Sequence, residues 1–328
     1  MIKQISLSQI TGFRVGHAQD TEHATGCTAI ICENGGWAGV DVRGGSPASR
    51  ETELLRPENT VQQIHCVMLS GGSAYGLEAG DGAMQFLEEK GIGFDVGIGR
   101  VPIVCGASLF DLELVSAKYR PDKKMGYEAC RNAWLGGEPA QGNVGAGTGA
   151  TVGKFHNTED MMKCGIGIWA GQIGDVQCGA IVAVNALGDV VDYETGRILA
   201  GLLNKEHTGF ADTRRCMYEE LQKNRDLWSG NTTIGCVITN ARLDKAQCRK
   251  AAVIAHDGYA QTIRPAHCTV DGDTLFVMAS GQVEVAPDSF YAMACEAVAR
   301  AVNQAALCAA PAYGLKAAAD FRPADCPA

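Results

Sequence analysis

The feature that most constrains the fold is an uncharged run at residues 232–239, Thr-Thr-Ile-Gly-Cys-Val-Ile-Thr, which starts abruptly after a polar stretch. Isoleucine or cysteine occupies every second position from residue 234, and glycine, valine and threonine lie between them. Neither face of an extended segment with this pattern is suited to water. The run therefore predicts a strand that is buried on both faces, with the rest of the chain built around it.

Thr232 occupies the first position of this strand, directly after Gly230 and Asn231. A threonine hydroxyl is a weak nucleophile unless a base takes its proton. If the Asn231–Thr232 bond is cut, Thr232 gains an α-amino group that titrates near ~8, whereas a lysine amine titrates near ~10.4. The hydroxyl itself could make the cut by attacking the Asn231 carbonyl, and Gly230 permits the strained backbone that this reaction needs. An ordinary strand that opens with two β-branched residues has the same pattern, so both interpretations stay open.

Charge and cysteine content exclude several classes of protein. The formal net charge of −9 over 328 residues comes with scattered Lys and Arg, which argues against nucleic acid and anionic membranes as partners. No stretch approaches the ~18 apolar residues of a membrane span, and the first residues lack the apolar run of a signal peptide. The 14 cysteines are therefore expected to be reduced, in a cytoplasmic protein. Dispersed histidines and the absence of a CxxC pair predict no metal. Four cysteines in apolar runs are expected to be small buried hydrophobes: Cys66, Cys105, Cys178 and Cys236.

Periodicity and turn residues predict alternating strands and helices through the chain. The segments at 164–170 and 178–184 are expected to form an antiparallel hairpin, with Asn185 ending its second strand. Residues 194–229 are predicted to be a mobile connection that contains a helix, and the last residues are predicted to be loose. The other expected strands lie at 28–31, 37–42, 61–69, 190–193 and 275–279, and the expected helices at 126–133, 243–256 and 289–309. A further helix is expected to follow residues 70–77 and to end at residue 90.

Three loops could line a polar site. Residues 43–52 combine Arg43 and a second arginine with glycines, which suits a carboxylate or another polar substrate but also an ordinary solvated loop. Ser73 lies at a strand-to-helix turn whose backbone amides could bind an oxyanion, although the GxSxG pattern of a nucleophile elbow fails two residues later. The Gly-rich stretch 142–153 ends in Lys154 but lacks the residues of a P-loop, and no predicted strand precedes it as a dinucleotide fingerprint requires. It is better interpreted as backbone folded closely around a polar site.

The sequence Asp271-Gly272-Asp273 lies just before the strand expected at 275–279. Two carboxylates around one glycine are typical of a plain turn. The alternative role is a carboxylate pair that orients the amine and the hydroxyl of Thr232.

Several motifs, spread in order through the chain, resemble those of one family. They include Thr25-Gly-Cys-Thr28, Ala38-Gly-Val-Asp-Val-Arg-Gly-Gly45, Ser70-Gly-Gly-Ser-Ala74, Phe110-Asp-Leu112, Gly142-Asn-Val-Gly-Ala-Gly-Thr-Gly149, Asn231-Thr-Thr233 and Asp271-Gly-Asp-Thr-Leu-Phe276. Together they resemble the DmpA-like family of N-terminal-nucleophile hydrolases, which includes L-aminopeptidase/D-esterases, β-peptidyl aminopeptidases and nylon-oligomer hydrolases. The resemblance extends over residues 10–310. It implies an α/β fold, a layered α-β-β-α sandwich with helix layers outside two packed sheets, as in the ornithine acetyltransferases.

The resemblance also implies how the chain matures. Residues 1–328 would form one hydrolase domain that cuts itself before the nucleophile, into chains of residues 1–231 and 232–328. Both chains would stay together, and the cut units would assemble into homotetramers or larger.

The same resemblance implies roles for individual residues. Thr232 would act as nucleophile and base, and Asn185 as a donor to the oxyanion. Three further residues would tune and hold the nucleophile: Lys154, Asp271 and Asp273. Candidates for substrate binding are Tyr127, Ser73 and Arg43, of which Tyr127 is placed loosely at the family's site tyrosine.

The sequence therefore predicts a self-processing amide hydrolase without a cofactor. It would release N-terminal residues from small peptides, amides or esters through a threonyl ester. One alternative is an acyltransferase, because ornithine acetyltransferase has a similar fold and an N-terminal threonine. Another is an uncut relative that only binds a ligand. The pattern leaves open whether the substrate is an α-peptide, a β-peptide, a D-residue or an ω-amino amide.

Overall fold

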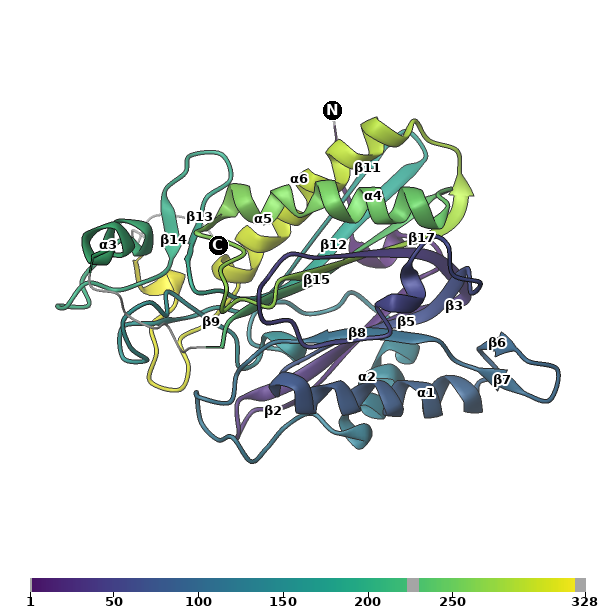
Figure 1. The fold of residues 1–328 in the computed structure, drawn as a ribbon, viewed down its shortest axis with the longest axis horizontal. Coiled ribbons are helices and arrows are strands. Elements are labelled where there is room, and N and C mark those ends of the chain that lie inside the picture. Colours follow the sequence, from purple (N-terminus) through teal and green to yellow (C-terminus); the bar gives the residue numbers. More distant parts are fainter. Residues whose placement is uncertain (1, 223–229, 322–328) are drawn as a thin grey trace.

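The computed structural model describes residues 2–222 and 230–321. These residues are organised around one ten-stranded sheet, whose strands follow the order β1-β11-β12-β15-β17-β3-β5-β8-β4, with β2 paired to β3. In Figure 1, α4, α5 and α6 lie over one side of the molecule and α1 and α2 over the other. The strands of this sheet are β1 (Lys3–Gln4), β2 (Arg14–Asp20), β3 (Thr25–Val42), β4 (Ser49–Arg50), β5 (Gln63–Ser70), β8 (Val104–Ser108), β11 (Ile166–Ile173), β12 (Val176–Asn185), β15 (Thr232–Ala241) and β17 (Thr274–Val283).

The helices and the smaller sheets complete the chain. The described residues also form three smaller sheets, two of which pair strands that follow one another in the chain. The α-helices are α1 (Ala79–Glu89), α2 (Lys123–Leu135), α3 (Thr213–Glu220), α4 (Lys245–Ala255), α5 (Asp257–Thr262) and α6 (Pro287–Leu307). The short strands are β6 (Phe94–Asp95), β7 (Arg100–Val101), β9 (Thr151–Val152), β10 (Met162–Lys163), β13 (Asp189–Val191), β14 (Ile198–Ala200) and β16 (Ile263–Arg264).

Strand β3 joins the two halves of the large sheet. Residues 37–42 of β3 pair with β17, and residues 25–31 pair with β2. Residues 27–31 and 36–37 pair with β5. The register shifts midway along β3, near Gly35, whose φ is +78°. The two strands expected at 28–31 and 37–42 are therefore one bent strand, because the glycines between them permit a bulge without ending the pairing.

The bent sheet closes on itself around the main core. Ile30 and Val67 from one half belong to the same buried cluster as Ile181 and Ile234 from the other half. Two further clusters lie under the helices, one beneath α4, α5 and α6 and one beneath α1 and α2. The expected α-β-β-α sandwich is confirmed, and its two packed sheets are the two halves of one continuous sheet.

Strand β15 lies in the middle of this arrangement. It pairs antiparallel with β12 on one side and parallel with β17 on the other. All ten of its residues are buried. Ile234 points into the central core, and Val237 points into the cluster under the helices. The sequence-based prediction of a strand buried on both faces is confirmed.

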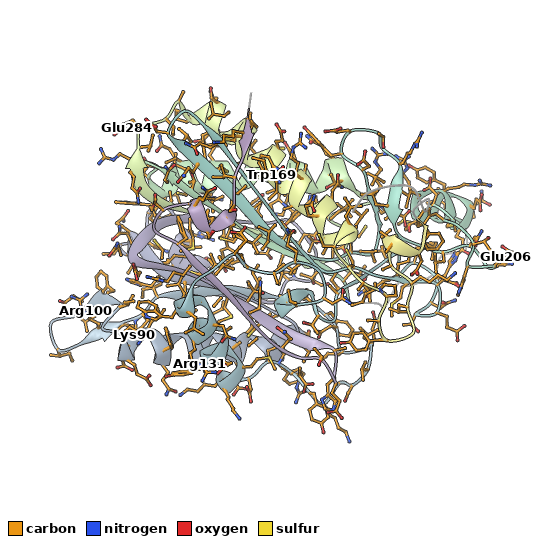
Figure 2. The ribbon with its side chains drawn as sticks, turned by 180° about the vertical axis from the view of Figure 1, so that it is seen from behind. Lys90, Arg100, Arg131, Trp169, Glu206 and Glu284 are labelled. Carbon is orange, nitrogen blue, oxygen red and sulfur yellow. The ribbon has the colours of Figure 1, made fainter. Side chains whose placement is uncertain are left out.

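Helix α6 packs closely on β11 because β11 carries a glycine at the contact. A Cβ atom on Gly167 would lie 2.0 Å from the carbonyl oxygen of Ala301. Trp169, two residues further along the same face, lies in the cluster under α6 and is labelled in Figure 2. The guanidinium carbon of Arg300 on α6 lies 5.6 Å from the centroid of the Trp169 ring. The helix expected at 289–309 is thus found, and it begins at Pro287, where a missing N–H costs nothing.

The other predicted elements are found with shifted ends. The helix expected to follow residues 70–77 is α1, and a 3₁₀ helix over Ser73–Glu78 leads into it. The connection expected at 194–229 contains α3 as predicted, and also the short strand β14. Its last part, and the end of the chain that was expected to be loose, lie outside the described residues.

Three further observations bear on the classes of protein considered. Within residues 2–222 and 230–321, no helix is long and apolar enough to cross a bilayer. The same ranges contain no group of three His, Cys, Asp or Glu side chains placed to hold a metal ion. The four cysteines predicted to be buried are fully buried and free: Cys66, Cys105, Cys178 and Cys236.

Candidate active site

Thr232 lies where three segments of the fold meet. Because β12 and β15 are antiparallel, Asn185 at the end of β12 pairs with Thr232 at the start of β15. Because β15 and β17 are parallel, the residues that precede these two strands lie at the same edge of the sheet. Asn231 accordingly forms a parallel bridge with Asp271. The topology thus brings the predicted nucleophile beside Asn185 and the Asp-Gly-Asp turn.

The hydroxyl of Thr232 faces the carbonyl group that precedes it. Thr232 Oγ1 donates a hydrogen bond to the Asn231 carbonyl oxygen, and the Gly272 N–H donates to the same oxygen at 2.9 Å. Thr232 is 3% exposed. A Cβ atom on Gly272 would lie 2.7 Å from Thr232 Oγ1, so glycine is needed for the turn to approach this closely. The Asn231 carbonyl therefore lies between a hydroxyl and a backbone donor.

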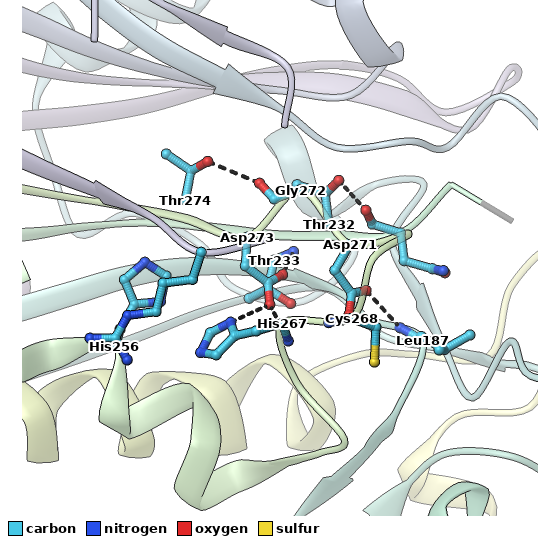
Figure 3. A network of polar contacts seen from close by, with 12 residues as sticks. Leu187, Thr232, Thr233, His256, His267, Cys268, Asp271, Gly272, Asp273 and Thr274 are labelled. Carbon is cyan, nitrogen blue, oxygen red and sulfur yellow. Dashed lines mark hydrogen bonds and ion pairs between the residues drawn. The ribbon is translucent and has the colours of Figure 1, made fainter. Parts of the chain in front are cut away.

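Asp273, in the Asp-Gly-Asp turn, is hydrogen-bonded to the beginning of β15 (Figure 3). Its Oδ1 accepts the Thr233 N–H at 2.8 Å. Its Oδ2 accepts a hydrogen bond from the backbone N–H of His267 at 3.0 Å. The same oxygen is hydrogen-bonded to Nδ1 of the His267 ring at 2.8 Å. A carboxylate with three donors around it is suited to carry a negative charge. Asp273 thus fixes the backbone one residue after Thr232.

Asp271 has a different environment. Its Oδ2 accepts the Cys268 N–H at 2.8 Å, and its Oδ1 accepts the Leu187 N–H at 3.4 Å (Figure 3). Burial raises the pKa of Asp271 to about 7, and the negative charge of Asp273 adds to this shift. One carboxyl of the pair is therefore suited to hold a proton near neutral pH.

Lys154 approaches the site from the opposite side. Its Nζ donates to Asn185 Oδ1 at 2.7 Å, and it lies 3.5 Å from the Gly230 carbonyl oxygen. Glu113 Oε1 lies 3.3 Å from the same nitrogen. Burial lowers the pKa of Lys154, while the Glu113 carboxylate opposes this shift. The ammonium thus lies against the residues that precede the Asn231–Thr232 bond.

Asn185 is held from both ends of its amide. Its Oδ1 accepts from Lys154 and from the Thr151 N–H at 3.1 Å. Its Nδ2 donates to the Phe110 carbonyl oxygen at 2.8 Å. An amide nitrogen has two hydrogens, so one donor is left for another acceptor. The Gly-rich stretch before Lys154 thus supports this amide, as expected of backbone folded around a polar site.

Two candidates for substrate binding lie apart from this cluster. Tyr127 is on α2, where its hydroxyl donates to Glu89 and its ring packs edge-on against Phe86. The structure does not bring Tyr127 to Thr232, because α2 belongs to the outer helix layer. Ser73 begins a 3₁₀ helix and donates its N–H to the Leu109 carbonyl at 2.8 Å, one residue before Phe110. Ser73 therefore neighbours the segment that holds Asn185 and does not contact Thr232 itself.

Arg43 contributes its backbone rather than its guanidinium. The side chain is engaged by Asp41 at 2.7 Å and by Asp257 at 3.2 Å, on the side of α4 and α5. The Arg43 N–H, in contrast, donates to the Asp273 carbonyl oxygen at 3.0 Å. The Ser46 N–H donates to the Asp271 carbonyl oxygen at 2.8 Å. The backbone of the loop at residues 43–52 thus stabilises the Asp-Gly-Asp turn. The Arg43 guanidinium does not face Thr232.

Some residues of the cluster were not among the predicted set. His267 is hydrogen-bonded to Asp273, and Glu113 forms an ion pair with Lys154. The carbonyl oxygen of Phe110 accepts a hydrogen bond from the Asn185 side-chain amide. Of these three residues, Phe110 lies in a motif that resembles the family, Phe110-Asp-Leu112, and Glu113 follows that motif directly. His267 lies shortly before the Asp-Gly-Asp turn and belongs to none of the quoted motifs. Nothing in the local pattern indicates that these segments meet at β15.

Comparisons with known proteins fit this geometry. The profile of peptidase family S58 matches residues 6–319. The chain belongs to peptidase family S58. An uncharacterised aminopeptidase of Mycobacterium leprae is 40% identical over 294 residues, which cover 85% of this chain and 79% of the relative. A 6-aminohexanoate-oligomer endohydrolase of Paenarthrobacter ureafaciens is 31% identical over 281 residues, covering 84% of this chain and 74% of that protein.

The fold of this S58 peptidase also has a solved counterpart. The L-aminopeptidase D-Ala-esterase/amidase of Ochrobactrum anthropi, described as a variant of the Ntn hydrolase fold, superposes with a TM-score of 0.67. The superposition covers 93% of this chain and 86% of that chain, at 17% identity. The resemblance, the fold class and the enzymatic nature predicted from the sequence are therefore confirmed.

Proposed function

We propose that this S58 peptidase is a self-processing amide hydrolase of the aminopeptidase type, with Thr232 as its N-terminal nucleophile. The observation that carries the proposal is the shared acceptor at the Asn231 carbonyl. The Thr232 hydroxyl and the Gly272 N–H meet at that oxygen, at the one bond whose cleavage would free the Thr232 amine. A threonine that opens an ordinary strand needs neither contact.

Self-processing would follow from this arrangement. Thr232 Oγ1 attacks the Asn231 carbonyl carbon, and the charge that develops on the oxygen is stabilised by the Gly272 N–H. The Asn231–Thr232 C–N bond then breaks, and the proton lost by the hydroxyl ends on the departing nitrogen. Water hydrolyses the resulting ester, which leaves the Asn231 carboxylate and a free threonine at residue 232. The products are chains of residues 1–231 and 232–328.

Substrate hydrolysis would repeat the chemistry with the new amine as base. The neutral Thr232 amine takes the hydroxyl proton, Oγ1 attacks the substrate carbonyl, and the protonated amine returns the proton to the leaving nitrogen. The free hydrogen of Asn185 Nδ2 is suited to the oxyanion. The buried Lys154 ammonium favours the neutral form of the nearby amine by charge repulsion. Water then releases the acyl group from Thr232, so no cofactor is needed.

The substrate is proposed to be a small peptide, amide or ester with a free amino end. Support comes from the relatives, which include proteins named as aminopeptidases and a 6-aminohexanoate-oligomer endohydrolase. We further propose that the cut units act in the cytoplasm as homotetramers or larger.

The first experiment is the intact mass of the purified protein with N-terminal sequencing of any smaller band. A 97-residue fragment (328 − 231) that begins Thr-Thr-Ile is expected. It should be absent in Thr232→Ala. A single stable chain of 34.5 kDa would overturn the self-processing mechanism. Product analysis with an amine acceptor separates hydrolysis from acyl transfer, because a transferase gives little hydrolysis when acceptor is present.

A further inference from the structure

His267 holds Asp273 through two separate groups. Both its backbone N–H and its ring Nδ1 bond the same oxygen, Asp273 Oδ2, at 3.0 and 2.8 Å. The φ of His267 is +60°, in the left-handed region that non-glycine residues rarely adopt. Such a conformation persists where the surroundings require it, and it is enriched at functional sites. One residue in a strained conformation thus makes two hydrogen bonds to one oxygen of Asp273. This indicates that the fold holds His267 in place to support this carboxylate.

The other side of the His267 ring lies against two aromatic rings. Within the described residues, its Nε2 is buried without a hydrogen-bond partner. The ring packs edge-on against His256, with centroids 5.0 Å apart, and lies 6.3 Å from the ring of Tyr259. Burial lowers the pKa of His256 to about 4, and its Nε2 bonds the Asp41 carbonyl oxygen at 2.9 Å. His267 is thus packed against a neutral ring, and its Nδ1 faces Asp273.

The two aspartates of the turn differ in the donors that they receive. Asp273 accepts three hydrogen bonds of 2.8 to 3.0 Å. Asp271 accepts one backbone hydrogen bond of 2.8 Å, one of 3.4 Å, and a hydrogen bond from the Cys268 thiol, which is a weak donor. Two buried carboxyls this close resist being ionised together. The shorter and stronger donors therefore favour the charge on Asp273 and the proton on Asp271, and His267 supplies two of the three donors to Asp273.

We infer that His267 is a positioning residue. It keeps the negative charge of the carboxylate pair on Asp273 and fixes Asp273 against the first residues of β15. Through the Thr233 N–H, this contact would hold the backbone of Thr232 in register with Asn185 and Gly272. The inference rests on the proposed function only for its effect on catalysis. The other titratable or charged groups that act on the pair or the His267 ring are Lys154, Cys268, His256 and Tyr259, and Asp41 lies behind His256.

Three substitutions separate the ring from the backbone. His267→Asn keeps a side-chain N–H donor and tolerates a positive φ. His267→Gly removes the ring but relieves the backbone, and His267→Ala removes the ring without relieving it. The kinetics are measured against pH on the cut, purified enzyme with a chromogenic amino-acid anilide. We expect His267→Ala and His267→Gly to lower kcat on the order of 100-fold, with KM changed little, and to move the acidic limb of the profile to higher pH. His267→Asn should retain the wild-type limb.

A purely structural role has a different outcome. It would lower Tm in His267→Ala, leave the acidic limb of the pH profile in place in all three variants, and be rescued by His267→Gly, which lacks the ring but adopts the positive φ without strain. That result would overturn the inference.

A second measurement does not depend on activity. In ring-¹⁵N-histidine-labelled Thr232→Ala protein, the His267 signals are identified by their loss in His267→Asn. We expect a protonated Nδ1, an unprotonated Nε2 and a low-field Nδ1 proton that moves in Asp273→Asn. A proton on Nε2 alone would overturn the inference and leave the proposed function standing. If the spectrum is as expected but the protein hydrolyses no substrate, the His267–Asp273 contact is supported and the proposed function is not.

Discussion

The N–H of Gly272 donates to the carbonyl oxygen of Asn231 at 2.9 Å, across the parallel pairing of β17 and β15. This contact relates two loops that are far apart in the sequence and that meet because parallel strands start at the same edge. It also fixes what can happen at Asn231. The carbonyl is held in place, polarised by a backbone donor and exposed to the Thr232 hydroxyl.

The hydroxyl of Thr232 is expected to be required for cutting, and the hydroxyl of Thr233 is not. Thr232→Ala should give only the uncut chain, while Thr232→Ser should still cut because serine keeps the nucleophilic oxygen. Thr233→Val is the matched control: Thr233 Oγ1 is buried without a hydrogen-bond partner among the described residues, and valine has the same shape. Intact mass spectrometry during expression and storage checks all three. Cutting in Thr232→Ala would exclude this nucleophile.

Gly272→Ala is expected to abolish cutting, or to slow it by at least the roughly 10²- to 10³-fold that loss of one oxyanion donor costs. The added Cβ would lie 2.7 Å from Thr232 Oγ1 and 2.7 Å from the Ser46 carbonyl oxygen, so the turn must withdraw from Asn231. Gly99→Ala serves as the control, since a Cβ there meets nothing within 4 Å. The rate of fragment appearance is followed by gel and mass spectrometry. Normal cutting in a folded Gly272→Ala protein would remove Gly272 from the mechanism.

Two buried lysines are expected to respond differently to the same change. Lys154→Met removes the ammonium beside Asn185 and should lower kcat for amide hydrolysis on the order of 100-fold, because the oxyanion donor and the nearby amine lose their support. Lys245 is also buried, but within residues 2–222 and 230–321 its Nζ donates only to backbone carbonyls, of Leu54, Asn59 and Val61. Lys245→Met should lower Tm and leave kcat close to that of the wild type. Equal losses of kcat in both variants would mean that Lys154 acts through stability alone.

Much of the fold follows from local pattern. The buried strand at 232–239 and the final alanine-rich helix both have strong periodicity, and both are found. The continuity of β3 could not be predicted, because a run of Asn and Gly at its centre has the composition of a turn. Whether such a run ends a strand or bends it is decided by the partners on each side, β5 and β17, which lie far along the chain.

The site shows the same division. Thr232, Asn185 and the Asp-Gly-Asp turn could be found from the sequence because each lies at the end of a strand that the pattern predicts. Arg43 could not be placed, since a guanidinium reaches several neighbours and here it reaches Asp41 and Asp257. His267 carries no local signal at all. Its contribution depends on a positive φ and on a carboxylate that only the folded turn presents.

The proton on Asp271 is expected to make stability depend on pH. An aspartate in an unfolded chain titrates near ~3.9, whereas burial and the charge of Asp273 raise the pKa of Asp271 to about 7 in the folded state. The folded state thus binds this proton more tightly, so the contribution to stability is fully present below ~pH 4 and is lost as the pH rises through ~7. Asp271→Asn carries no such proton. Its free energy of unfolding, relative to the parent, should therefore rise between ~pH 4 and ~pH 7.5, by about 4 kcal/mol at most.

The measurement uses urea denaturation in a Thr232→Ala background, so that parent and variant are both uncut chains. Asp175→Asn, at an exposed turn, is the control and should show a flat difference across the same pH range. The free energy of unfolding of Asp271→Asn should instead rise steadily relative to that of its parent as the pH rises. Only the parent must lose a buried proton or hold two negative charges close together. A flat or falling difference would place the proton elsewhere in the pair, and it would also remove the reason for His267 to hold the charge on Asp273.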